Sequence, residues 1–164
     1  MAYLLDANVL MEAKNRYYGF DFCPAFWDWL IQANAEEKVF SIEKVSDEIK
    51  AGDDRLTEWA VARGDQFFVK PTPPVAEKLG QVADWVKQQG YDTPAITTFM
   101  EKADCYLVAH ALADKHDLVT LEVASSSRKR IKIPNVCIGL GIKCLTPFDM
   151  LGQEKVRFIL KTTS

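Results

Sequence analysis

Short apolar runs alternate along this chain with segments whose apolar residues recur at helical spacing. The runs typical of short buried strands are residues 3–5, 39–41, 67–69, 118–121 and 143–145. The helical pattern covers residues 42–50, 75–89 and 103–115. Strands separated by helices predict βαβ crossovers and a mainly parallel sheet covered by helices on both faces. The predicted fold class is therefore α/β, a three-layer α/β/α sandwich with about five strands.

The length suits one domain. The chain has 164 residues, and its hydrophobic share of 48% is ordinary for a globular protein with a real core. We find no internal repeat, low-complexity tract or linker, so residues 1–164 are interpreted as a single domain.

Charge and cysteine usage narrow the function classes. Twenty Lys and Arg against 23 Asp and Glu give a net charge of −3, so any nucleic-acid contact must be local. The four cysteines form no C-x-x-C pair and are expected to be reduced. The sequence shows no basic leader before the first predicted strand. It also contains no apolar run of about 18 residues, the length that a membrane span requires. The expected location is the cytoplasm, with no membrane segment.

Four acidic residues fall where the predicted strands and helices would bring them to one edge of the sheet. Asp6 follows the first strand, Glu48 lies on the helix after the second, Asp104 begins the helix before the strand at 118–121, and Glu122 ends that strand. Ligands bind at the carboxyl ends of strands in open α/β sheets. Carboxylates gathered there need cations, so the pattern indicates a metal site.

Each acid also has an ordinary structural alternative. Asp6 or Asn8 caps the following helix, Asp104 favours a helix N-terminus, Glu48 points to water, or Glu122 begins a polar turn. These alternatives must be invoked separately, whereas one metal site accounts for all four positions.

The oxygen-only donor set favours a hard divalent cation, Mg²⁺ or Mn²⁺. Asp6 and Asp104 are the expected direct ligands, and Glu48 and Glu122 complete the site by holding waters or a second ion. Asn8 is expected to orient Asp6 or hydrogen-bond a water. Such a site would activate water for in-line attack on a phosphodiester.

A basic run follows the last acid. Arg128, Lys129 and Arg130, with Lys132, lie in a loop after Glu122, which would place cations over the acidic edge to hold phosphates. Lys14 and Arg16, in the helix after Asp6, are further candidates for contact with a nucleic-acid backbone. A solvated surface run is the alternative.

Several of these motifs resemble a known family, the PIN-like ribonucleases to which toxins of the VapC type belong. Residues 4–10 (LLDANVL) resemble the family's opening, and residues 45–49 (VSDEI), 103–109 (ADCYLVA) and 118–122 (LVTLE) resemble its later acid-bearing segments. Residues 23–29 (CPAFWDW) and 133–137 (IPNVC) look like a bacterial and archaeal PIN-like group. In many PIN toxins the fourth acid is Asp and another acid follows, whereas here Glu122 precedes Val-Ala-Ser.

The resemblance implies an Mg²⁺- or Mn²⁺-dependent endoribonuclease, with RNA as substrate and a co-encoded antitoxin as partner. The oligomeric state stays open, a homodimer included. Two alternatives remain. One is a nuclease-inactive PIN-like module that binds RNA or protein. The other is a doubly wound enzyme of another class, such as an aspartyl-phosphate phosphatase, which requires a second Asp where Asn8 stands, or a receiver-like domain, which requires paired acids before its first helix.

Overall fold

Five parallel strands form one sheet, in the order β3-β2-β1-β4-β5, in the computed structural model, which describes residues 2–162. The strands are β1 (Tyr3–Leu5), β2 (Val39–Ile42), β3 (Phe68–Val69), β4 (Asp117–Val119) and β5 (Cys144–Leu145). β1 lies at the centre and pairs Tyr3 with Val39 of β2 and with Asp117 of β4. All five strands predicted from the apolar runs are present.

The strands are short, with two to four residues each, and the central ones are almost fully buried. Leu4 and Leu5 of β1 and Leu118 and Val119 of β4 are at most 1% exposed. Strands of a parallel sheet are covered on both faces and therefore read as continuous rather than alternating hydrophobic runs. The predicted three-layer α/β/α sandwich is confirmed.

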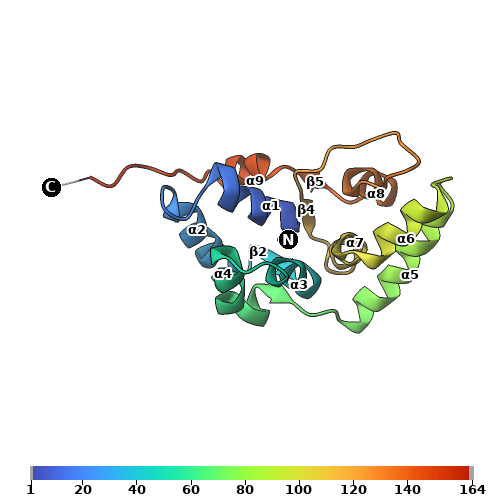
Figure 1. Ribbon diagram of the computed structural model, residues 1–164, viewed down its shortest axis with the longest axis horizontal. Helices are drawn as coiled ribbons and strands as arrows, with labels where there is room; N and C mark the ends of the chain where they lie inside the picture. The colour runs from blue at the N-terminus through green and yellow to red at the C-terminus, as the bar shows by residue number, and fades with distance from the viewer. Residues whose placement is uncertain (1, 163–164) are drawn as a thin grey trace.

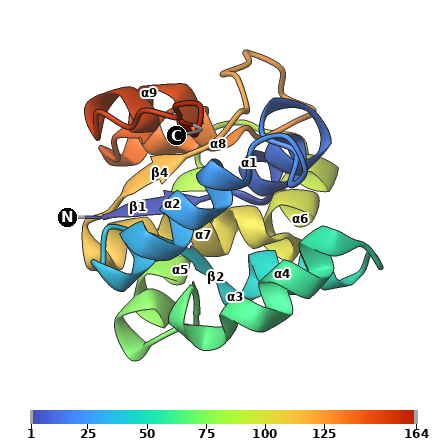
Figure 2. The same ribbon diagram turned by 90° about the vertical axis from the view of Figure 1, so that its left-hand side faces the viewer.

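Helices cover both faces of the sheet (Figures 1 and 2). The helices after β1 are α1 (Ala7–Glu12), the π-helical η1 (Ala13–Tyr17) and α2 (Pro24–Ala35). Those after β2 are α3 (Glu43–Lys50), α4 (Arg55–Arg63) and the 3-10 helix η2 (Gly64–Gln66). The remaining helices are α5 (Pro73–Lys87), α6 (Thr93–Glu101), α7 (Ala103–Asp114), α8 (Ile133–Leu140) and α9 (Pro147–Gln153).

The direction in which the chain crosses from one strand to the next decides which face of the sheet each helix covers. Right-handed crossovers that run from β1 to β2 and from β3 back to β4 place their helices on opposite faces. In Figure 1, α1 and α2 lie with α9 on one side of the sheet, and α5 to α8 lie on the other. The helix α7 is the most enclosed of these, since Leu107, Val108 and Ala109 are fully buried.

The predicted end of the fourth strand is wrong. β4 ends at Val119 rather than at residue 121, so Glu122 lies in the following loop and not at the strand's end. The Thr120 N–H still donates to the Leu145 carbonyl at 2.9 Å. Beyond it, the Thr120 hydroxyl accepts from the Glu122 N–H at 3.0 Å, which turns the chain away from the sheet.

Helix boundaries differ from the sequence pattern by one or two residues. For example, α5 begins at Pro73 instead of residue 75, because proline is well suited to the first helical turn. The helices α4, α6, α8 and α9 have seven to nine residues each and were not among the predicted segments, because about two turns leave few apolar positions to repeat. The eight-residue α3 was predicted, because its apolar stripe is followed by a stop at Gly52.

Two further predictions concern cysteines and membranes. Cys23, Cys105, Cys137 and Cys144 are free thiols, as expected. Within residues 2–162, every helix is too short or too polar to cross a bilayer.

Candidate functional site

Asp6 lies at the carboxyl end of β1, where the chain turns into α1. Its carboxylate accepts hydrogen bonds from the Ala7 N–H at 2.7 Å and from Thr120 Oγ1 at 2.8 Å. Its own N–H continues the parallel ladder to the Val119 carbonyl at 2.9 Å. Asp6 therefore does cap α1, as the structural alternative predicts, and it is also held at the sheet edge with only 5% of its surface exposed.

Thr120 organises this edge, although it was absent from the residues selected by sequence. Its hydroxyl donates to Asp6 and accepts from the Glu122 N–H at 3.0 Å and from Asn8 Nδ2 at 3.3 Å. A hydroxyl has one donor and two acceptor positions, so all of its capacity is used. Asn8 also accepts from the Leu121 N–H at 3.1 Å, which ties α1 to the loop after β4. Sequence reasoning did not select Thr120, because a single threonine near an acidic residue forms no recognisable pattern.

Asp104 reaches the same edge from the first turn of α7. This helix joins β4 through Lys115 and His116 and runs antiparallel to it, so its N-terminus lies at the carboxyl end of the sheet. The Asp104 side chain is half-buried. Within residues 2–162, its carboxylate has neither a hydrogen-bond donor nor an ion-pair partner in contact.

Glu48 and Glu122 each accept a hydrogen bond from a helix N-terminus. Glu48 Oε1 lies 3.2 Å from the N–H of Ala103 at the start of α7, and Glu122 Oε2 lies 2.8 Å from the N–H of Ile133 at the start of α8. Carboxylates are favoured at helix N-termini because the first N–H groups have no partner within the helix. Glu48 is exposed and Glu122 half-buried, so both keep a water-accessible side.

The acids share one electrostatic field. Burial raises the pKa of the Asp6 carboxyl from 3.8 to about 7, and the charge of Asp104 adds to this, whereas the Thr120 hydrogen bond opposes it. Burial likewise raises the pKa of Asp104 to about 6, followed by the charges of Glu122 and Glu48. Two carboxyls that resist ionisation in this way lie where a positive charge would be stabilising.

The donor chemistry fits a hydrated hard cation. Among residues 2–162, no three carboxylate, imidazole or thiol side chains gather closely enough to hold one ion. Mg²⁺ typically takes only one or two carboxylates and keeps several waters. Asp6 and Asp104 are suited to bind the ion directly, because neither forms an ion pair with a cation within residues 2–162. Glu48 and Glu122 are suited to hold coordinated waters.

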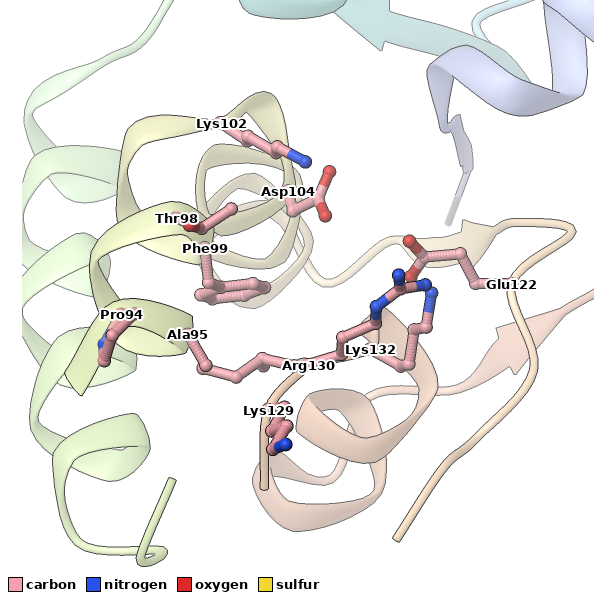
Figure 3. A pocket seen from close by; sticks show the side chains of 11 residues that line it. Pro94, Ala95, Thr98, Phe99, Lys102, Asp104, Glu122, Lys129, Arg130 and Lys132 are labelled. Atoms are coloured by element: carbon pink, nitrogen blue, oxygen red, sulfur yellow. The ribbon is translucent and has the colours of Figure 1, made fainter. Parts of the chain in front are cut away.

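A cavity of about 480 Å³ opens beside Asp104 and Glu122 (Figure 3). Of the basic run identified by sequence, Lys129, Arg130 and Lys132 line it, and Arg128 does not. Lys102, the N-cap of α7, also lines it and was missed, because one lysine before an acidic motif carries no signal in a sequence.

Lys14 and Arg16 lie elsewhere. Lys14 forms an ion pair with Asp54 at 2.6 Å, and Arg16 pairs with Glu12 at 3.0 Å. Lys14 lines a smaller cavity that includes Glu48. The charges of both residues are already balanced by carboxylates, so they offer less to a phosphate than the cations around the larger cavity.

Replacing Thr120 with valine is expected to lower the free energy of unfolding by about 1–3 kcal/mol, because a buried acceptor and two donors lose their partner. Urea denaturation measures the change. Thr120→Ser keeps the hydroxyl and is the matched control. Equal stability of the valine and serine variants would contradict the organising role of the hydroxyl.

These features define an α/β sandwich with an acidic carboxyl edge next to a basic cavity. One chain of the crystal structure of VapBC2 from Rickettsia felis, bound to a DNA fragment from their promoter, has a similar fold, with a TM-score of 0.56 over 89% of this chain and 98% of that chain. The two sequences are 14% identical, so the likeness is one of fold.

Family membership follows from the sequence. Residues 3–158 match the family described as Domain of unknown function (DUF4411), and the chain therefore belongs to this family. The sequence matches no curated protein.

Proposed function

We propose that this protein is a PIN-like endoribonuclease that hydrolyses RNA phosphodiester bonds with Mg²⁺ or Mn²⁺, and that it is the toxin of a toxin–antitoxin pair. The proposal is carried by the position of two acids, without cationic partners among the described residues, beside a cavity lined by cations. Asp6 and Asp104 are shielded carboxyls with raised pKa values, neither has a cationic partner within residues 2–162, and the cavity beside Asp104 is lined by cations. Carboxyls that a metal ion would stabilise therefore lie next to cations that a phosphate would stabilise, which supports a site that cleaves phosphodiesters.

The residues divide the chemistry between them. A bound divalent cation supplies Lewis acidity, which activates water and polarises a phosphoryl oxygen. Asp6 and Asp104 would hold the ion, and Thr120 keeps the Asp6 carboxylate in place through the 2.8 Å hydrogen bond. Glu48 and Glu122 would orient water at the ion. The cavity cations would position the RNA backbone and offset the negative field of the acids.

Asn8 argues against the phosphatase alternative. Both ends of its amide are engaged by the loop after β4, through Thr120 and Leu121. A phosphatase would need an acid at this position to donate a proton to the leaving group. Asparagine has no ionisable proton, and the hydrogen bonds of this asparagine keep it from approaching a leaving group. The position serves the geometry of the loop that carries Glu122.

The test is cleavage of single-stranded RNA by the purified protein. We expect cleavage with Mg²⁺ or Mn²⁺, none in EDTA, and recovery when the metal is restored in excess, because the acids provide no strong nucleophile without a cation. Product analysis by denaturing gel separates internal from terminal cleavage. Activity that persists in EDTA would contradict a metal-dependent site.

The toxin role is supported by the resemblance of residues 4–10 and 103–109 to PIN toxins and by the fold shared with VapBC2. We expect induced expression in a bacterium to arrest growth and a co-encoded partner to restore it. Colony counts after induction measure both effects. Normal growth with demonstrably active protein would assign the nuclease to another cellular role.

A nuclease-inactive binding module is the second candidate. It is favoured by the hydrogen bonds that Glu48 and Glu122 make to the N-termini of α7 and α8, which give both acids a structural purpose. The two candidates differ in one measurement, since the module predicts RNA or protein binding in the presence of metal without cleavage.

A further inference from the structure

The cavity beside Asp104 has an excess of positive charge. Lys102, Lys129, Arg130 and Lys132 line it, against the two carboxyls Asp104 and Glu122. Figure 3 shows Lys102 extending toward Asp104, and Arg130 and Lys132 extending toward the Glu122 end.

None of these four cations pairs with a carboxylate within 4.0 Å in the described part of the chain. Lys14 and Arg16 do form such pairs. Unpaired cations that converge on a concave surface attract an anion from solution more strongly than charges already balanced by a neighbour.

The loop that carries three of the cations is anchored. Asn135 donates to the Ser125 carbonyl and accepts from the Ser125 N–H, both at 2.9 Å. Further along, the Arg128 carbonyl accepts from the Asp92 N–H at 3.0 Å, which fixes the loop to the start of α6. An anchored loop loses less freedom when it binds a ligand, so its cations are ready to receive an anion. Arg128 serves this loop through its backbone, and its side chain is not part of the cavity lining.

The cavity also offers surfaces that a bare phosphate would not use. The exposed Pro94 provides an apolar wall and the exposed Thr98 adds a hydroxyl, above a floor of the buried Ala95, Phe99 and Ile131. The volume of about 480 Å³ is typical of sites for small organic ligands, which range from about 300 to 1,000 Å³. Apolar wall, hydroxyl and cations together match a nucleoside phosphate, whose base needs the first two and whose phosphate needs the third.

We propose that this cavity is a subsite for one unpaired nucleotide of the RNA substrate, with its phosphate on Lys102, Arg130 and Lys132 and its base against the wall formed by Pro94 and Thr98. The inference rests on the proposed ribonuclease function and specifies its substrate. A base held in a duplex cannot leave its stack to enter the cavity without the cost of unpairing, so the site favours single-stranded over double-stranded RNA.

The first experiment measures binding in EDTA, where cleavage is excluded. Calorimetric titrations use 5′-AMP, adenosine and inorganic phosphate, and fluorescence anisotropy uses a labelled single-stranded oligoribonucleotide and its duplex. We expect AMP to bind at least about tenfold more tightly than adenosine or phosphate and to compete with the single strand, and the duplex to bind more weakly than the single strand.

Variants separate charge from shape. Replacing Lys102, Arg130 and Lys132 together with glutamine should weaken AMP and single-strand binding at least about tenfold and reduce the salt slope by about 0.7 for each phosphate that the variant no longer neutralises. Lys87→Gln, which removes an exposed lysine of α5 outside the lining, is the control and should change neither. Thr98→Trp should block the cavity by bulk, weakening AMP binding while all four cations stay in place. Unchanged melting temperatures show that each variant is folded.

The outcomes are distinguishable. Equal binding of single strand and duplex, or glutamine variants that bind like the wild type, would overturn the subsite. AMP that binds without competing with RNA would identify a site for free nucleotides and would also overturn the subsite. The subsite would be overturned as well if the cations bound an acidic protein partner and showed no response to nucleotides. RNA cleavage with no AMP binding would remove the subsite alone, whereas AMP and RNA binding with no cleavage in metal would remove the nuclease function alone.

Discussion

Asp6→Asn and Asp104→Asn are each expected to reduce RNA cleavage about 100-fold or more. Metal coordination contributes several kcal/mol to transition-state stabilisation in phosphoryl transfer, and each 1.4 kcal/mol is about a factor of ten in rate. Asparagine keeps the size of the side chain but removes the charge that would hold the ion. Initial rates at saturating Mn²⁺ and saturating RNA measure the effect on turnover separately from substrate binding.

The matched control is Asp117→Asn. Asp117 is a buried aspartate of the same sheet, 6% exposed, but it lies at the opposite, amino end of β4, where Lys143 is 3.9 Å away. This variant should retain wild-type cleavage. If all three variants lose activity equally, the loss reflects general destabilisation, and if none does, the catalytic acids are elsewhere.

The raised pKa values of Asp6 and Asp104 are expected to make these two residues lower the stability of the metal-free protein as the pH rises from about 4 to about 7, which is measured as the difference between the wild type and its Asn variants. His110 and His116, whose pKa values are lowered by burial, act in the opposite direction in wild type and variants alike. Between 3.8, the ordinary pKa of an aspartate, and about 7, the folded chain keeps a proton on Asp6 that the unfolded chain has released. The free energy of unfolding falls wherever the folded state binds more protons than the unfolded state. Asp104 contributes in the same direction up to about pH 6. Asp6→Asn and Asp104→Asn should flatten this part of the pH profile.

Divalent metal should reverse the loss. Mn²⁺ at about 100 times its Kd adds about 2.7 kcal/mol, which for a chain of this size is a rise of about 5–10 °C in melting temperature. The rise should be larger at pH 8 than at pH 5, since protons compete with metal for Asp6 and Asp104. Scanning calorimetry in EDTA and in Mn²⁺ measures both effects. Because the two histidines are present in the wild type and in every variant, their titration cancels in the comparison. A metal response that is the same in wild type and Asp104→Asn would remove Asp104 from the ligand set.

The fold and the acidic positions were largely predictable because they depend on local patterns. The apolar run at residues 3–5 and the aspartate that follows it identify a buried parallel strand and its carboxyl end, and β1 occupies those residues. The position of Asp104 follows from chain direction, because a helix that precedes a parallel strand must begin at the carboxyl end of the sheet. Whether these acids are catalytic stays a prediction.

Tertiary structure decided what depends on contacts between distant segments. The hydroxyl of Thr120 is important because Asp6, 114 positions away, meets it at the sheet edge, and Glu48 caps a helix that begins 55 positions later. The cavity exists only because α6, the start of α7 and the loop after Glu122 enclose it, so neither the contribution of Lys102 nor the exclusion of Arg128 has a local signal. Periodicity along a chain specifies which face of an element is buried, whereas the partners of a polar side chain are set by packing across the whole fold.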